Sequence, residues 1–325
     1  MKSRTVLSIV GLLLMITFVG CQSAEPPVEE AAAAPTFEGC WNITETFEER
    51  TASSWIQIKP EGDGWTGLFL HRGGHPMPAA VEITGDELKV TMQKEDPEAD
   101  WSERTPPVLI GKLEGERLVG TGTSWREAPL TFTGERAPDR LEGSDREVEW
   151  GEPIDLLAGG DLSAWQVLEG RRPSQWKVED GMLVNAESGA NLRTVDEFRD
   201  FKLHIEFKIP PKSNSGIYMR GRYETQVADT FGMEPFSRAV GGIYGHLTPT
   251  VNAAKPAGEW NTVDLTLVGY RVTVVVNDQT TIDGQLLPGI TGGALDPNES
   301  EPGPIMLQGD HGTVSYRNIV ITPAM

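Results

Sequence analysis

Apolar and polar residues alternate in short runs along most of this chain, with a period of two residues. A period of two places successive side chains on opposite faces of a β-strand. Turn signals at 62–64, 85–86 and 114–116 separate the runs of the first half of the chain. Evenly spaced short strands predict an antiparallel meander, so we expect a small antiparallel β-barrel or β-sandwich over residues 36–140. The runs are 55–58, 67–70, 81–83, 87–92, 108–110, 117–119 and 130–132.

Longer alternating runs follow in residues 151–325. The run 201–209 carries Phe, Leu, Ile, Phe and Ile on one face and Lys, His, Glu and Lys on the other. Gly269-Tyr270 separates two further runs, and glycine at the first central position suits a type II′ hairpin turn. No long stretch has a helical period. We therefore expect an all-β chain whose second domain is two packed antiparallel sheets, preceded by a charged linker at 141–150.

The N-terminus reads as a targeting signal. Lys2 and Arg4 precede the apolar run 6–19, which is short for a membrane span but suits a signal-peptide core. Residues 18–21, Phe-Val-Gly-Cys, resemble a bacterial lipobox, in which Cys21 would become the lipidated first residue. An ordinary secretory signal with a chance cysteine is the alternative. We expect a signal peptide at 1–20 and a flexible tether at 21–35.

This signal predicts a lipid-anchored protein of the cell envelope, facing the periplasm or the surface. The 28 lysines and arginines stand against 48 aspartates and glutamates, a formal net charge of −20. Such a surface repels phosphate backbones, so we expect no nucleic-acid partner and no membrane contact beyond the lipid anchor. Cys21 and Cys40 are the only cysteines, so no disulfide framework or zinc finger is expected.

Polar side chains follow the strands predicted for the second domain. Glu206, Arg220, Glu224 and Gln226 fall on the polar side of their strands, and Tyr218 shares the face of Arg220. If these strands are neighbours, they build a charged and aromatic floor typical of carbohydrate sites. The alternative is a solvated sheet face with cross-strand ion pairs.

Two loops add candidate site residues. Residues 252–261 concentrate Lys255, Glu259, Trp260 and Asn261, and residues 303–312 place Gln308, Asp310 and His311 beside glycines. Glycine allows the backbone to approach a ligand closely. A histidine in such a loop, with an aspartate beside it, is a candidate general base because its ordinary pKa is near neutrality.

In the first domain, His71 and His75 flank Gly73-Gly74. The pair suggests either a metal site or a solvated hairpin, and the hairpin is the favoured interpretation. No catalytic grouping is evident there, so this domain is expected to be accessory, with an unknown protein partner.

The second domain resembles a known family through ordered motifs. They are Asn214-Ser-Gly-Ile, Arg220-Gly, Glu224-x-Gln226, Gly242-Ile-Tyr-Gly245, Lys255-Pro-x-Gly-Glu-Trp-Asn261, Gly303-Pro-x-x-Leu-Gln-x-Asp-His-Gly and Tyr316-Arg-Asn-Ile319. The family is the 3-keto-disaccharide hydrolases, long called a domain of unknown function. The resemblance covers about 150–323 and implies a concanavalin-like jelly-roll sandwich.

The resemblance implies an enzyme that acts on glycosides oxidised to a ketone at C3. A base removes the C2 proton, the C1 substituent leaves by β-elimination, and water then completes net hydrolysis. His311 would be the base, oriented by Asp310 or a nearby carboxylate, with Lys255 or Arg220 stabilising the enolate and Glu224 as acid or alternative base. The substrate-binding set would be Glu206, Asn214, Tyr218, Gln226, Tyr244, Glu259, Trp260, Asn261, Gln308 and Asp310.

Other interpretations stay open. A divalent metal could replace the cation, with His311, Glu224 and Asp229 as candidate ligands. Glu224-x-Gln226-x-x-Asp229 also approximates the two-carboxylate motif of some sandwich-fold glycosidases, although glutamine holds its centre. A carbohydrate-binding envelope lipoprotein without catalysis is the non-enzyme alternative, and a structural lipoprotein whose first domain docks a partner is the third.

Overall fold

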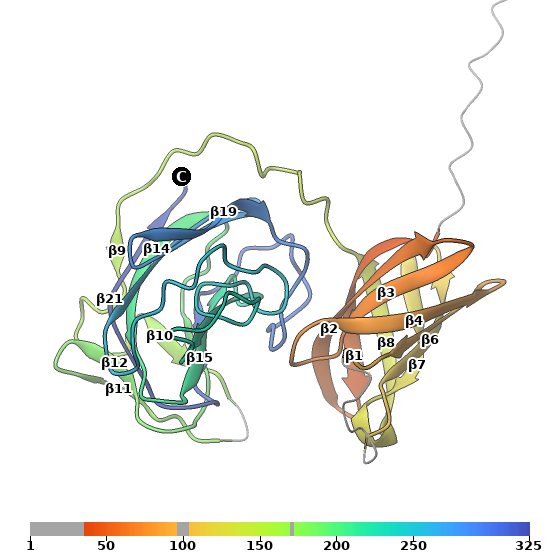
Figure 1. The fold of residues 1–325 in the computed structure, drawn as a ribbon, viewed down its shortest axis with the longest axis horizontal. Helices are drawn as coiled ribbons and strands as arrows, with labels where there is room; N and C mark the ends of the chain where they lie inside the picture. The colour runs from red at the N-terminus through yellow and green to blue at the C-terminus, as the bar shows by residue number, and fades with distance from the viewer. Residues whose placement is uncertain (1–35, 96–103, 170–171) are drawn as a thin grey trace, which may run out of the picture. The chain divides into compact units, whose positions relative to one another are not determined.

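The computed structural model describes residues 36–95, 104–169 and 172–325 (Figure 1). Within these residues the regular structure is β apart from one 3-10 helix, Trp125–Glu127. The all-β prediction is confirmed. In the same residues no helix has the length and apolar character needed to cross a bilayer. The predicted signal peptide 1–20, the predicted tether 21–35 and Cys21 lie outside the described residues.

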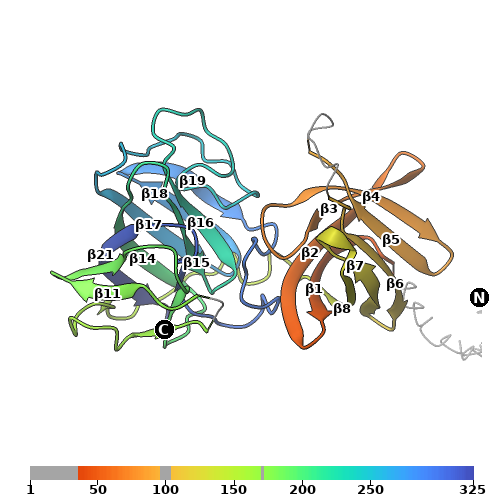
Figure 2. The ribbon, with the colours of Figure 1, turned by 90° about the horizontal axis from the view of Figure 1, so that it is seen from below.

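The first domain is a closed antiparallel barrel, which is one of its two predicted forms (Figure 2). Each strand pairs with the next in the chain, and the last pairs with the first. Apolar residues such as Trp41, Ile43, Ile56 and Phe69 fill its interior. The strands are β1 (Gly39–Phe47), β2 (Arg50–Glu61), β3 (Gly64–Leu70), β4 (Met77–Thr84), β5 (Glu87–Met92), β6 (Val108–Glu114), β7 (Arg117–Thr123) and β8 (Pro129–Arg136).

The second domain is a sandwich of two antiparallel sheets (Figure 1). The five-stranded sheet has the order β10 (Trp165–Val167), β13 (Leu192–Thr194), β20 (Met306–Leu307), β15 (Asn214–Met219) and β16 (Tyr223–Ala228). The alternating run 201–209 supplies a central strand of the other sheet, and its apolar face lies in the core. The hairpin at Gly269-Tyr270 is also present, with Val268 opposite Arg271.

The eight-stranded sheet covers the other side of this core. Its order is β11 (Trp176–Glu179), β12 (Met182–Asn185), β21 (Val314–Pro323), β14 (Phe201–Lys208), β17 (Asn261–Val268), β18 (Arg271–Val276) and β19 (Gln279–Leu286), with β9 (Ile154–Asp155) paired to β21.

A buried ion pair fixes the segment that leaves the barrel. The two terminal nitrogens of Arg140 each lie 2.7 Å from a carboxylate oxygen of Glu299, and the Tyr223 hydroxyl donates to the same carboxylate at 2.8 Å. Glu299 is 1% exposed. Ser144 follows, and its hydroxyl accepts from the Tyr270 N–H. The segment predicted as a linker is therefore bonded to the sandwich.

We expect Arg140→Ala to destabilise the protein by about 3–5 kcal/mol, because it leaves the Glu299 charge buried without a partner. Urea unfolding followed by fluorescence measures the shift. Arg117→Ala is the matched control: its side chain is 59% exposed and 3.7 Å from Glu135, so its loss should change stability by less than ~1 kcal/mol. Equal effects of the two variants would contradict a structural role for the buried pair.

Candidate active site

A cavity of about 180 Å³ lies over the five-stranded sheet. It is smaller than the roughly 300–1,000 Å³ of sites for drug-sized ligands, and its size suits a single sugar ring. Strands β15 and β16, the loop after β20, the 290–293 loop and the barrel's β3–β4 loop contribute to its walls. The lining residues are Gly73, Gly74, Asn191, Asn214, Tyr218, Glu224, Tyr244, Gly292, Gly293, Gln308, Asp310 and His311.

Tyr218 and Glu224 form the floor of this cavity. They stand directly opposite each other on β15 and β16, so their side chains share one face of the sheet. The Tyr218 hydroxyl lies 2.9 Å from Glu224 Oε2, and both residues are buried. Gly216, two residues earlier on β15, leaves the space that the Glu224 carboxyl occupies; a Cβ there would overlap its Oε1.

Hydrogen-bond geometry indicates that Glu224 holds a proton. The Tyr218 oxygen lies within hydrogen-bond distance of both Glu224 Oε2 and the Gly292 carbonyl oxygen, at 2.9 and 2.8 Å. One hydroxyl hydrogen can serve only one of these acceptors. Both contacts are satisfied if Glu224 donates to Tyr218 and Tyr218 donates to Gly292. Burial, helped by the nearby Asp310 charge, raises the pKa of Glu224 to about 8, which agrees with a neutral carboxyl.

His311 and Asp310 form a second ionisable pair at the same cavity. His311 Nδ1 lies 2.7 Å from Asp310 Oδ1, and about half of each side chain is exposed. The hydrogen bond from His311 lowers the pKa of Asp310. An aspartate that accepts from Nδ1 leaves Nε2 as the basic nitrogen of the ring. The pair therefore has the form of an oriented general base.

The glycines beside His311 have a different purpose from the predicted one. They were expected to admit a ligand, but a Cβ at Gly309 would overlap the Ala190 carbonyl and one at Gly312 would lie 2.5 Å from the Ser213 hydroxyl. Asn185 also donates to both Gly309 and Gly312 carbonyls at 2.9 Å. These glycines therefore let the loop pack tightly on its own domain, which holds the His311 segment in place.

Two residues that line the cavity have a buried side-chain oxygen without a hydrogen bond. Asn214 Oδ1 and Gln308 Oε1 are buried and have no partner among the described residues. A buried polar atom without a partner is unfavourable, so such atoms in native proteins need an explanation. Both residues line the cavity, and a movement of either side chain would be needed before a sugar hydroxyl could donate to its oxygen. Tyr244 also lines the cavity, and burial raises the pKa of its hydroxyl, so it stays a hydrogen-bond donor near neutrality.

Arg220 is not in this cavity, which corrects its predicted catalytic position. The strand β15 ends at Met219, and Arg220 begins the turn with φ 51°. Its guanidinium is 1% exposed and donates to the carbonyls of Arg199 and Gly269 and to Asp200 Oδ1. Strict alternation fails here because the chain turns one residue earlier than the pattern suggests.

The loop 252–261 also lies away from the cavity. Lys255 is exposed and its Nζ donates to the Trp260 carbonyl at 3.1 Å. Asn261 accepts from the Lys255 N–H at 2.8 Å and is buried as a loop support, while Glu259 is exposed. Lys255, predicted as a candidate to stabilise the enolate, is thus not among the residues that line the cavity with Glu224.

Glu206 lies in the other sheet of the sandwich, and Trp260 directly precedes strand β17 of that sheet. Glu206 pairs with Arg317 at 2.7 Å, and the Arg317 guanidinium lies 4.1 Å from the centre of the Trp260 ring. Lys208 covers the same ring at 4.9 Å. The predicted continuous floor is wrong because β14 and β16 lie in different sheets.

The remaining residues of the predicted motif, Gln226 and Asp229, form neither a metal site nor a carboxylate pair with Glu224. Gln226 is buried and accepts from the Val227 N–H, and Asp229 accepts from the Lys212 N–H at 2.9 Å, outside the cavity. Across residues 36–95, 104–169 and 172–325, no group of three His, Cys, Asp or Glu side chains could hold a metal ion. The trio of His311, Glu224 and Asp229 is thus not gathered, and neither is the Glu224–Asp229 pair of a two-carboxylate glycosidase.

Sequence reasoning missed the glycine walls and Asn191. It also described the His71 hairpin as solvated, whereas His71 is 4% exposed and its Nδ1 lies 2.9 Å from the buried Glu45 carboxylate. Two Gly-Gly pairs, 73–74 and 292–293, come together here from distant parts of the chain. The sequence around one pair does not indicate that the other pair lies beside it. The doubled glycines were the only sign of this wall that the sequence offered.

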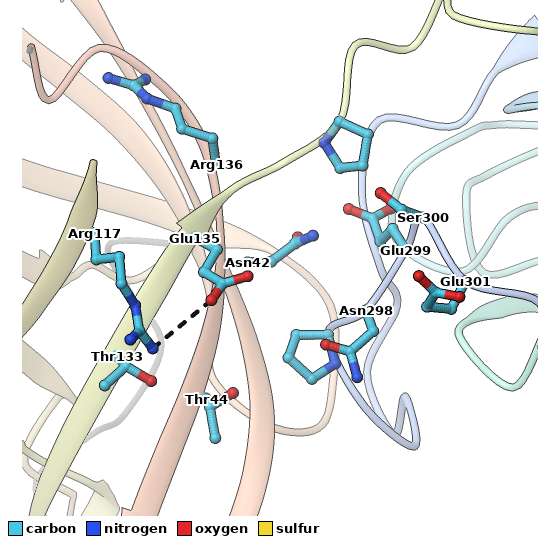
Figure 3. A pocket seen from close by; sticks show the side chains of 12 residues that line it. Asn42, Thr44, Arg117, Thr133, Glu135, Arg136, Asn298, Glu299, Ser300 and Glu301 are labelled. Carbon is cyan, nitrogen blue, oxygen red and sulfur yellow. Dashed lines mark ion pairs between the residues drawn. The ribbon is translucent and has the colours of Figure 1, made fainter. Parts of the chain in front are cut away.

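A larger cavity, about 260 Å³, lies between barrel strands and residues 297–301 (Figure 3). Figure 3 shows Glu135 turned toward Arg117, an exposed pair. Glu299 forms an ion pair with Arg140. Among the described residues that line it there is no histidine or tyrosine. The smaller cavity, in contrast, contains the ionisable groups that acid–base catalysis needs, Glu224, Asp310 and His311.

Comparison with known proteins identifies the sandwich. Residues 152–322 match the family model of the 3-keto-alpha-glucoside-1,2-lyase-like domain. A 3-keto-disaccharide hydrolase of Bacteroides thetaiotaomicron is 25% identical over 220 residues, which are 55% of this chain and 75% of that protein.

Two solved structures are similar to part of this chain. A protein assigned as a glycosyl hydrolase from Parabacteroides distasonis is 29% identical, with a TM-score of 0.45, over 57% of this chain and 92% of that one. A β-glucanase of Bacillus licheniformis is 12% identical, with a TM-score of 0.37, over 53% and 98%. On the family match, which spans more than half of its residues, this chain belongs to the 3-keto-alpha-glucoside-1,2-lyase-like family and is an enzyme that cleaves glycosidic bonds.

Proposed function

We propose that this enzyme cleaves glycosides whose sugar carries a ketone at C3, by elimination across C1–C2 followed by addition of water. One observation carries the proposal: the buried carboxyl of Glu224, whose pKa burial raises to about 8, and the imidazole of His311, bonded to Asp310, line the same sugar-sized cavity. The names of the matched family and of the Bacteroides thetaiotaomicron relative give the same substrate class.

His311 takes the proton from C2. The C3 ketone makes that proton acidic, because the electron pair of the C2–H bond can move onto the ketone oxygen as an enolate. Asp310 holds Nδ1 as the donor nitrogen and stabilises the imidazolium that forms. Nε2 of His311 therefore ends this step with the proton.

When substrate binds, the single carboxyl proton of Glu224 turns from Tyr218 to the ketone oxygen, and Glu224 donates a hydrogen bond there as the negative charge on that oxygen grows. A carboxylic acid kept neutral by burial can serve as such a donor at neutral pH. This role replaces the cation predicted at Lys255 or Arg220, since no lysine or arginine occurs among the described residues that line the cavity. The hydroxyl of Tyr244 is positioned to be a second donor.

The enolate then expels the C1 substituent. The C1–O bond breaks, a double bond forms between C1 and C2, and the leaving oxygen takes the proton from the His311 imidazolium. Water next adds across that double bond, with its oxygen on C1 and a proton on C2. The net change is hydrolysis, with neither oxidation nor reduction.

The purified protein should release the aglycone from a 3-keto-glucoside and leave the parent glucoside intact, because only the ketone acidifies the C2 proton. Chromatographic product analysis of both substrates measures this. Equal rates on the two substrates would replace the proposal with direct glycoside hydrolysis.

His311→Asn is the informative variant for the same assay. It keeps a side chain that can hydrogen-bond Asp310 but removes the base, so turnover should fall by about 10²–10⁴-fold. Because the imidazole is half-exposed, the thermal unfolding temperature should stay within ~2 °C of the parent. Full activity in this variant would exclude His311 as the base.

The pH profile tests the neutral state of Glu224. Since burial raises its pKa to about 8, kcat should decline above pH 8 as the donor proton is lost. Glu224→Gln keeps an N–H donor that does not ionise, so its lower rate should show no such decline. A decline at the same pH in the variant would assign that titration to another group.

A stability measurement gives a check independent of turnover. The folded state holds the Glu224 proton up to about pH 8, whereas the unfolded chain releases it near the ordinary value of 4.5. Stability should therefore fall with rising pH across this window by roughly 1.4 kcal/mol per pH unit from this group, and Glu224→Gln should lack that component.

We also propose that the enzyme is held at the cell envelope by a lipid on Cys21. The lipobox-like residues 18–21 support this placement. Cys21→Ser should move the protein from the membrane fraction to the soluble fraction, measured by fractionation and immunoblotting. Retention of the variant in the membrane fraction would contradict a lipid on this cysteine.

A further inference from the structure

We propose that the barrel's β3–β4 loop, residues 71–76, is a wall of the sugar pocket and that Gly73 is a specificity-determining residue. This inference rests on the proposed function. Gly73 and Gly74 line the same cavity as Glu224 and His311. The barrel would then take part in substrate recognition, rather than serve as the accessory domain predicted from the sequence.

The loop is fitted closely to the sandwich. The Gly293 N–H donates to the Arg72 carbonyl at 2.9 Å, and a Cβ at Gly292 would overlap the backbone of Gly74. The His75 and Tyr244 rings lie edge to face with centres 6.5 Å apart. The wall is therefore in direct contact with residues that line the cavity.

Two further glycines of the sandwich lie against the barrel outside the cavity. A Cβ at Gly245 would lie 2.9 Å from Pro76 Cδ, and one at Gly289 would lie 2.5 Å from Trp55 Nε1. Trp55 is buried and packs edge to face on His246 of the sandwich, with ring centres 5.4 Å apart. Glycine at positions 245 and 289 thus leaves room for Pro76 and Trp55 of the barrel.

A buried polar cluster inside the barrel sets the position of the loop. Glu45 is buried, and its Oε1 accepts from the Ser54 hydroxyl at 2.7 Å and lies 2.9 Å from His71 Nδ1. Its Oε2 accepts from Arg72 Nε at 3.3 Å, and the Arg72 N–H donates to Ser54 Oγ at 3.0 Å. The Arg72 guanidinium also lies over the Phe47 ring. Both residues that begin the loop are therefore anchored within the barrel.

Gly73 has no evident structural need for glycine. Unlike Gly74, whose φ is +79°, it does not adopt the left-handed backbone conformation that favours glycine. Among the described residues, no atom beyond its chain neighbours lies within 4 Å of the position of a Cβ at 73. The protein itself would accept a side chain there. Space for the substrate is the remaining reason for glycine at this wall.

The test compares Gly73→Ala, Gly73→Leu and the control Gly64→Leu in the full-length protein. Gly64 also lacks a left-handed φ, and the nearest atom to its Cβ position is 3.8 Å away, but it lies outside the cavity. KM for a 3-keto-disaccharide should rise with side-chain size at 73, by about tenfold or more for leucine, while Gly64→Leu stays at the parental value.

Thermal unfolding of all three variants separates a filled pocket from a damaged fold. We expect unfolding temperatures within ~2 °C of the parent. An unchanged KM in Gly73→Leu, with the parent active, would overturn the wall. A KM rise accompanied by an equal rise in Gly64→Leu would also overturn it. Absence of turnover in the parent would instead refute the proposed function.

Discussion

The burial of one carboxyl group under a tyrosine is the constraint on which the site depends. Glu224 can lie beneath the cavity only because β15 places Tyr218 opposite it and keeps Gly216 without a side chain. A buried carboxylate would be strongly unfavourable, so the group stays neutral near physiological pH. The same burial that weakens it as an acid gives it a proton to share with a growing negative charge. The fold and the chemistry are thus linked through a single desolvated side chain.

Most of the strands were predictable, because period-two alternation is a local property of the chain. The run 201–209 became β14 with its apolar face in the core, and Gly269 formed the expected turn. Alternation assigns a face to each side chain but does not say which strands share a sheet. That is why Glu206 was grouped with Glu224, although they lie in different sheets.

The cavity was predictable in part for a related reason. Tyr218, Glu224, Asp310 and His311 line one cavity, as do Asn214, Tyr244 and Gln308. Lys255 and Arg220 do not line it, because their charged side chains donate hydrogen bonds to acceptors elsewhere in the protein. Arg220 serves three acceptors in the core, and Lys255 serves the Trp260 carbonyl. The walls from 73–74 and 292–293 depend on tertiary contacts that no local pattern contains.

The clamp between Arg140 and Glu299 bears on where this polypeptide can be divided. The family match covers 152–322, yet the guanidinium that neutralises Glu299 comes from outside that span. A fragment trimmed to the matched boundaries would leave Glu299 without its arginine partner and would lose Gly73 and Gly74, two of the four glycines that border the cavity. The span that matches the family and the span that forms the cavity therefore have different boundaries in this molecule.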